Sequence, residues 1–243
     1  MSKPTLDAPT SFANNVAKWR WPPRKKVPRG EAHLVDTSAP PDRFVSFPGF
    51  NNWRGGAIFS FRQMKQLRDE FGVKTIVNLA REANDWVWDP ERGCGGSRRG
   101  DGRDNQCEGV WAKELGLRYI YMPLSGSWRM TQEKWTLLRD ALAEGNVYVH
   151  CAAGVDRTGA VVARWIREID PSVSHDQVMR YTRAIGGAWR REGDPNAKLR
   201  DWVAKGRYDP ELAARALRPR GGILPGLAVF AVGLFVFFRL RQS

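Results

Sequence analysis

The segment His150-Cys-Ala-Ala-Gly-Val-Asp-Arg-Thr-Gly159 places an arginine six positions after a cysteine. The apolar residues 147–149 before it predict a short buried strand, and residues 158–169 after it predict a helix with one apolar side. Gly154 permits a tight backbone turn between them. A strand, a turn and a helix in this order predict a loop whose backbone N–H groups surround a bound phosphate.

The side chains of this loop suit the hydrolysis of a phosphate monoester. Backbone N–H groups and a helix N-terminus stabilise a thiolate, which makes Cys151 the predicted nucleophile. Arg157 is expected to hold two phosphate oxygens, and Thr158 to donate a hydrogen bond to the departing sulfur. His150 is expected to order the loop rather than to titrate in the reaction. The predicted phosphate-binding loop consists of Cys151, Ala152, Ala153, Gly154, Val155, Asp156 and Arg157.

The expected reaction has two steps, through a phosphocysteine intermediate, and uses neither a metal nor a cofactor. His33 and His175 have no partners at metal-ligand spacing, and we interpret both as structural. Cys94 and Cys107 are interpreted as unpaired thiols, although a redox pair between them or with Cys151 stays open.

Alternating signals for strands and helices run from about residue 44 to residue 208. Strands separated by helices predict an α/β fold with a central, mostly parallel sheet flanked by helices. A segment rich in Gly and Arg near residues 90–105 interrupts the pattern and predicts a long surface loop. The other expected elements are strands at 73–79 and 117–122, a helix from the capping box Ser60/Gln63 to about Gly72, a helix from Thr131 to before Gly145, and a helix from the capping box Ser174/Gln177 to Gly186-Gly187.

The loop resembles the signature of protein tyrosine phosphatases, in particular their compact dual-specificity branch. Asn52-Trp-Arg-Gly-Gly56 and Val73-Lys-Thr-Ile-Val-Asn-Leu-Ala-Arg81 look like the early part of bacterial dual-specificity-like phosphatases, where an aromatic-Arg-Gly turn precedes a strand ending in Leu-Arg. The resemblance covers roughly residues 44–190. It implies a parallel sheet with the catalytic loop at the carboxyl end of a strand, and phosphorylated protein as the leading substrate.

The sequence departs from this family where an aspartic general acid is expected. Relatives often have Asp where this chain has Gly126, and no carboxylate lies between Arg118 and Met130. Three explanations compete. Asp156 is the acid, as the resemblance to myotubularin-type lipid phosphatases suggests; a carboxylate near the insertion replaces it; or the substrate has a good leaving group, as in cysteine-dependent RNA triphosphatases. We favour Asp156. The carboxylates near the insertion are Asp85, Asp89, Asp101 and Asp104.

The two ends of the chain differ from its middle in composition. Residues 1–43 form a basic extension with Pro and Trp and no apolar core, so we expect no secretory signal there. Residues 221–238 are 18 residues without a charge, which predicts a transmembrane anchor between a basic linker, 209–220, and a short tail, 239–243. Lys and Arg are more numerous before the anchor than after it, which predicts a cytoplasmic catalytic domain.

The charge balance narrows the choice of partner. The net charge is +13, which favours anionic partners such as phosphate esters or anionic lipid. No RNA-binding motif is recognisable, so nucleic acid is not an expected partner. Only three cysteines occur, which suits a reducing compartment.

We therefore expect a membrane-anchored tyrosine or dual-specificity protein phosphatase. The first alternative is a phosphoinositide or phosphatidylglycerophosphate-like phospholipid phosphatase, although Ala152 and Val155 stand where phosphoinositide phosphatases often have Lys. The others are an RNA 5′-triphosphatase and an inactive phosphate-binding protein, the last favoured by the missing upstream Asp and opposed by intact Cys151 and Arg157. Trp86 and Trp88 are expected either to line the pocket or to pack in the core.

Overall fold

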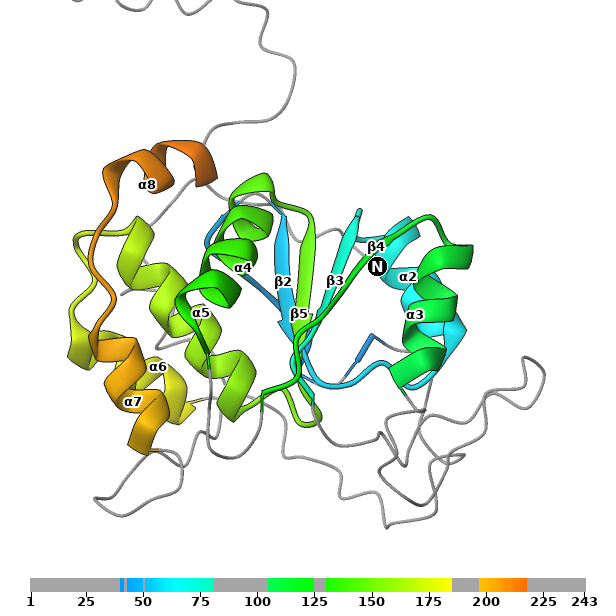
Figure 1. The fold of residues 1–243 in the computed structure, drawn as a ribbon, viewed down its shortest axis with the longest axis horizontal. Helices are drawn as coiled ribbons and strands as arrows, with labels where there is room; N and C mark the ends of the chain where they lie inside the picture. Colours follow the sequence, from blue (N-terminus) through cyan, green and yellow to red (C-terminus); the bar gives the residue numbers. More distant parts are fainter. Residues whose placement is uncertain are drawn as a thin grey trace, which may run out of the picture.

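The computed structural model describes residues 40–41, 43–49, 51–80, 105–124, 130–184 and 197–217. These residues form one mixed sheet with helices on both faces (Figure 1). The spatial order of the strands is β1-β2-β5-β3-β4; β1 pairs antiparallel with β2, and the other pairings are parallel. The predicted α/β fold with a mostly parallel sheet is confirmed. The strands are β1 (Val45–Phe47), β2 (Asn52–Gly55), β3 (Thr75–Asn78), β4 (Arg118–Tyr121) and β5 (Val147–His150).

The catalytic loop leaves from the middle of the sheet. β5 lies between β2 and β3 and all four of its residues are buried, because both of its faces are covered. In the register of the sheet Gly55 is paired with His150, and His150 with Asn78. The carboxyl ends of these three strands therefore meet at one edge, which we call the carboxyl edge.

Two layers of helices cover the sheet. α2 (Phe61–Asp69) and α3 (Asn105–Glu114) lie on one face, and α4 (Gln132–Glu144) and α5 (Asp156–Ile169) lie on the other (Figure 1). Three further helices pack on the outer side of α4 and α5. These are α6 (His175–Ala184), α7 (Ala197–Ala204) and α8 (Pro210–Ala216).

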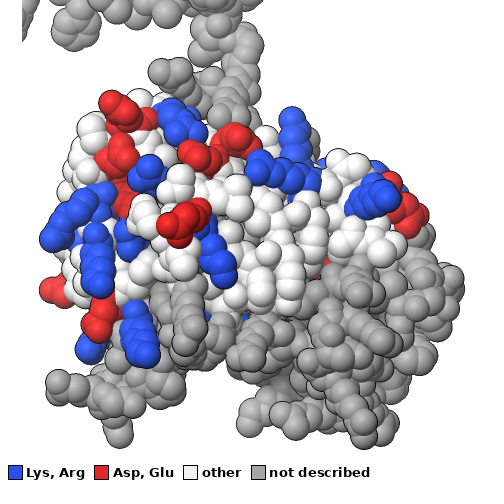
Figure 2. Space-filling view, viewed as in Figure 1, with Lys and Arg blue, Asp and Glu red and all other residues white. Residues whose placement is uncertain are grey.

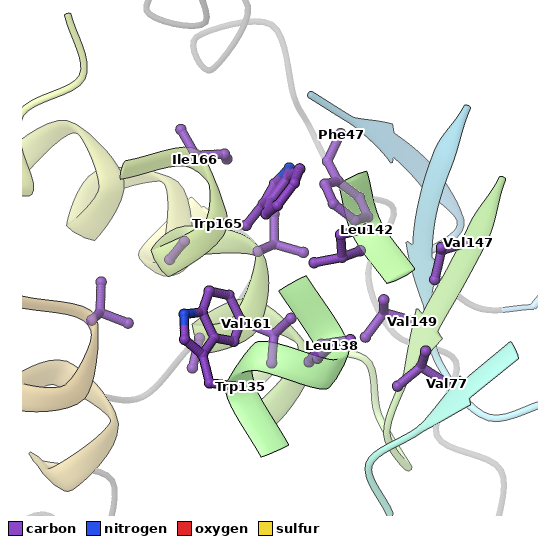
Figure 3. Packing of buried hydrophobic residues seen from close by; sticks show 14 of the residues in the cluster. Phe47, Val77, Trp135, Leu138, Leu142, Val147, Val149, Val161, Trp165 and Ile166 are labelled. Atoms are coloured by element: carbon purple, nitrogen blue, oxygen red, sulfur yellow. The ribbon is translucent and has the colours of Figure 1, made fainter. Parts of the chain in front are cut away.

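Alternation along β5 divides the apolar core in two. Val147 and Val149 face α4 and α5, whereas Tyr148 belongs to the cluster under α2 and α3. Figure 3 shows Trp135 of α4 and Trp165 of α5 packed in the first cluster. Burying a side chain of this size contributes about 1.5–3 kcal/mol. The apolar side predicted for the helix after the loop is confirmed, since Val161, Val162, Trp165 and Ile166 are all buried.

Helix ends follow the predicted caps. The hydroxyl of Thr131 accepts from the Lys134 N–H at the start of α4, and Gly145, at φ 79°, ends that helix. Ser174 and Gln177 form a reciprocal capping box, with N···O distances of 2.7 and 3.2 Å. At α2 the hydroxyl of Ser60 accepts from the Gln63 N–H as predicted, but the Gln63 side chain accepts from the N–H of Phe59.

Two local predictions need correction. Asn52–Gly55, which we expected in a turn, is strand β2, because Trp53 stacks on Phe44 while the next side chain, Arg54, is buried against Tyr181. This alternation is the period of a strand. α5 begins at Asp156 rather than at Thr158, so the helix already includes the end of the loop.

Several predicted segments lie wholly or largely outside the described residues. These are the basic extension, the Gly/Arg-rich insertion apart from Asn105, the transmembrane anchor 221–238 and the tail 239–243. Within the described ranges, every helix is too short or too polar to cross a bilayer.

Candidate active site

The loop after β5 packs tightly against the end of β2. Gly154 has a φ of +65°, and a Cβ atom there would lie 2.4 Å from both the carbonyl carbon and the oxygen of Gly55 and 2.7 Å from the nitrogen of Gly56. The Ala57 N–H donates to the carbonyl of Ala152 at 3.2 Å. A residue without a side chain is therefore required at position 154 for the loop to keep this shape.

Cys151 and Thr158 lie deep in this loop. Cys151 is a free thiol with 2% of its surface exposed, at the point where β5 ends. The hydroxyl of Thr158, in the first turn of α5, is buried and has no hydrogen-bond partner among the described residues. The first N–H groups of a helix also lack intrahelical acceptors, and together they favour an anion. This environment suits the predicted thiolate and the predicted donation from Thr158 to sulfur.

Two guanidinium groups approach the loop. Nη1 of Arg157 donates to the carbonyls of Leu79 at 3.4 Å and Leu124 at 3.3 Å, in the segments that follow β3 and β4. The backbone of the carboxyl edge therefore holds the Arg157 side chain. Nη1 of Arg43, a residue at φ 56°, donates to the carbonyl of Ala153 at 2.8 Å and adds a second cation beside the loop.

Asp156 is the first residue of α5 and is partly buried. A carboxylate at this position is stabilised by the helix N-terminus. Its role as the general acid stays a prediction. The alternative acids near the insertion, and the position of Gly126, lie outside the described residues.

A buried polar cluster lies directly behind the nucleophile, and the sequence analysis did not find it. Nε2 of His150 lies 3.2 Å from a carboxylate oxygen of Glu108 on α3, and neither side chain is exposed. The Asn78 amide donates to the same oxygen at 2.7 Å, and the Tyr119 hydroxyl donates to it at 3.2 Å. The rings of His150 and Tyr148 stack with centroids 5.5 Å apart.

The electrostatics of this cluster keep Tyr119 neutral. Burial, followed by the charge of Glu108, raises the pKa of Tyr119 far above its usual range. The phenol therefore stays a hydrogen-bond donor at physiological pH. One signal in the sequence points to this cluster: Asn78 is a polar residue at the end of the otherwise buried strand β3.

A second buried charge lies on the opposite face of the sheet. Arg54 is fully buried in β2, and its Nη1 donates to the hydroxyl of Tyr181 at 2.9 Å. Its Nε and Nη2 atoms have no hydrogen-bond partner among the described residues. Burial raises the pKa of Tyr181, and the neighbouring Arg54 opposes that shift.

Other candidate residues lie away from this site. His175 is the first residue of α6, where burial and then the charge of Arg167 lower its pKa. The described residues contain no group of three His, Cys, Asp or Glu side chains that could hold a metal ion. Cys94, Trp86 and Trp88 lie outside the described residues, and for Cys107 only its place in the α3 backbone is described.

A buried cysteine and an arginine six positions later, joined by a glycine-containing loop at the start of a helix, define a cysteine-dependent phosphatase site. The model of a family described as a DSP-PTPase phosphatase fused to NAD+ kinase matches residues 48–193, more than half of the chain. The chain therefore belongs to this family of dual-specificity-type phosphatases, and it is a cysteine-dependent phosphatase, as the resemblance implied.

Individual relatives agree with this assignment. Laforin of Mus musculus is 32% identical over 127 residues, which cover 49% of this chain and 37% of laforin. The chain thus spans well under two thirds of that relative's length. The core catalytic domain of the PP-IP phosphatase SIW14 from S. cerevisiae superimposes with a TM-score of 0.50 at 18% identity, over 72% of this chain and 90% of that domain. At that identity the similarity shows the fold alone.

Proposed function

We propose that this phosphatase hydrolyses phosphorylated proteins, phosphotyrosine first, while residues 221–238 anchor it to a membrane with the catalytic domain on the cytoplasmic side. Cys151 attacks phosphorus and forms the phosphocysteine, and Arg157 holds the equatorial oxygens. Asp156 protonates the leaving group, and Thr158 donates to sulfur as water releases phosphate. The step that departs from the upstream-acid pattern of the family is the protonation by Asp156.

The position of α8 relative to the catalytic loop carries the choice of substrate. The Asp209 N–H donates to the carbonyl of Glu168 at 2.8 Å, so α8 begins beside the carboxyl end of α5. The catalytic loop lies at the other end of α5. A helix of 14 residues is about 21 Å long, and Figure 1 shows α8 on the opposite side of the molecule from the carboxyl edge.

This separation bears on any lipid in the same bilayer. α8 is described to Leu217, and only residues 218–220 lie between it and the predicted anchor. Three extended residues span at most about 11 Å. With the anchor in a bilayer, the catalytic loop would face away from the headgroups, with the length of α5 in between. The arrangement therefore supports a soluble or peripheral phosphoprotein over a phospholipid of the same membrane.

The distribution of charge agrees with this choice. Lys and Arg side chains gather on the helical side of the molecule, with Asp and Glu among them (Figure 2). Burial, and then the nearby charges of Arg207 and Arg164, lowers the pKa of Arg167 near the end of α5. This crowding of cations lies beyond the far end of α5 from Cys151, so it does not bring anionic lipid to the catalytic loop.

A soluble inositol phosphate is the second candidate substrate. Arg43, which donates to the loop carbonyl of Ala153, supplies a cation that a polyphosphate would use. Against it, Ala152 and Val155 leave the loop itself without a basic side chain before Arg157.

The test is a comparison of substrates with the full chain reconstituted in vesicles. A phosphotyrosine peptide and a soluble short-chain phosphoinositide should have access to the site, whereas a long-chain phosphoinositide in the same vesicles should be hydrolysed at least about tenfold more slowly than its short-chain form. Faster hydrolysis of the embedded lipid than of the peptide would overturn the proposal. An inositol pyrophosphate and an RNA 5′-triphosphate complete the set.

Two variants identify the nucleophile in the same assay. Cys151→Ser should abolish turnover but retain phosphate binding, because the loop N–H groups and Arg157 remain. Cys107→Ser is the matched control and should keep wild-type activity. Residual turnover of more than a few per cent in Cys151→Ser would contradict the assignment of the nucleophile.

A further inference from the structure

The carboxylate of Glu108 is buried on α3 at the same depth as the imidazole of His150. Removing a carboxylate from water costs several kcal/mol unless a cation and hydrogen bonds compensate for the loss. Asn78 and Tyr119 supply two hydrogen bonds to one oxygen, but both are neutral donors. The cation that the structure offers at 3.2 Å is the imidazolium form of His150.

The groups that face His150 come from every element packed against it. α3 contributes Glu108, β3 contributes Asn78, β4 contributes Tyr119, and β5 itself contributes Tyr148, whose ring stacks on the imidazole. Among these groups Glu108 is the one that carries a charge at neutral pH. Because the Tyr148 hydroxyl donates to the carbonyl of Gly56 at 2.6 Å, that phenol is directed away from the imidazole.

We propose that Glu108 is a positioning residue of this phosphatase: its buried carboxylate holds His150 as an imidazolium immediately before Cys151. The proposal rests on the proposed role of Cys151 as nucleophile. A cation one residue before the thiolate stabilises it through space, in addition to the loop N–H groups and the start of α5. Glu108 acts through His150 and contacts neither phosphate nor sulfur.

This pair also explains why α3 packs where it does. Asn78 donates to Glu108 and accepts from the N–H of Ala80 at 2.8 Å, so the carboxylate is connected to the segment that follows β3. The carbonyl of Leu79 in that segment accepts from Arg157. Glu108 is therefore connected both to the residue before the nucleophile and to the residue beside the phosphate-binding arginine.

The first test is Glu108→Gln in the full chain, which keeps the shape and an acceptor for Asn78 but removes the charge. The rate of alkylation of Cys151 by iodoacetamide should fall at least about tenfold at pH 6, and the acidic limb of kcat/KM for an aryl phosphate should move to higher pH. KM should change much less than kcat. A profile that coincides with wild type at every pH would overturn the proposal.

Two control variants separate charge from packing. Tyr119→Phe removes a donor to the carboxylate but keeps its charge, so the acidic limb should stay near its wild-type position. Glu168→Gln alters a carboxylate that is 3% exposed and bound to Trp135 and Arg164, and it should lower the melting temperature without moving the limb. If Glu168→Gln shifts the limb as far as Glu108→Gln does, the effect is structural and the proposal fails.

Coupling between the two residues gives an independent measurement. In a His150→Asn background, Glu108→Gln should cause no further loss of alkylation rate, whereas additive losses would overturn the proposal. The chain has three histidines, so a ¹⁵N spectrum of the wild-type protein can be assigned to His150 by comparison with His150→Asn. The expected signature at pH 7 is imidazolium, with both nitrogens protonated, and a neutral ring would overturn the proposal. Alkylation and spectra need no substrate, so they separate this proposal from a failure of the proposed function.

Discussion

Replacing Gly154 by alanine tests whether the shape of the catalytic loop depends on its contact with β2. An alanine in the left-handed region costs about 1–2 kcal/mol. The new Cβ would also lie 2.4 Å from the carbonyl of Gly55, where ordinary contacts begin at 3.4 Å. Both sides of this contact are backbone, so the loop must move by about 1 Å, and forced overpacking of this kind costs a further ~1–3 kcal/mol.

The expected loss of stability in Gly154→Ala is therefore about 2–5 kcal/mol, out of a total that is commonly about 5–15 kcal/mol. A displacement of about 1 Å at a catalytic group can cost about 10²-fold in rate. The assay combines urea unfolding with kcat/KM on an aryl phosphate. A kcat/KM within about threefold of wild type would refute the argument, because the loop would then tolerate the displacement.

The chain offers two matched controls for this substitution. Gly72 and Gly116 both have a φ of +68°, and a Cβ at either position would meet nothing within 4 Å. Gly72→Ala and Gly116→Ala should therefore show only the backbone cost, about 1–2 kcal/mol, and should leave kcat/KM near its wild-type value. Equal effects in all three variants would mean that the contact between Gly154 and Gly55 contributes nothing.

Three further predictions concern single side chains. Asp156→Asn should slow hydrolysis of phosphotyrosine by about 10² or more yet barely change the rate on the most activated aryl ester, and equal slowing of both would assign Asp156 to loop shape instead. Arg157→Lys should lower kcat/KM severely, because an ammonium cannot copy the two-pronged contact, and a near-normal rate would show that the loop geometry is misread. The pKa of Tyr181 is raised by burial, so its contribution to stability is complete below the unfolded value of about 10 and is lost as the pH rises above it. Urea unfolding between about pH 8 and 11 should show a shallower alkaline decline in Tyr181→Phe than in wild type, and identical declines would contradict this prediction.

Local features of the sequence predicted the elements around the loop. The strand 147–150, the loop and the helix after it are contiguous, so apolar pattern and one glycine were sufficient to place them. The caps at Thr131 and Ser174 were predictable for the same reason, since each joins residues only three positions apart.

Elements that depend on distant partners were misread or missed. β2 was interpreted as a turn because Asn52–Gly55 ends in glycine, and its strand character depends on pairing with β1 and β5. The buried state of Arg54 likewise depends on Tyr181, on another helix. Short strands carry little periodic signal of their own, so a neighbouring strand decides whether they form.

By itself, the sequence determined the chemistry: a cysteine, an arginine six positions later and a glycine between them are sufficient to specify a phosphate-binding loop, because the loop's backbone and both of its functional side chains come from one continuous segment. Only the tertiary structure decided what surrounds that loop. Glu108 meets His150, and Gly154 meets Gly55, across the edge of a parallel sheet. In such a sheet the register aligns the carboxyl ends of strands that are far apart in the chain, and no local pattern encodes which residues then come into contact.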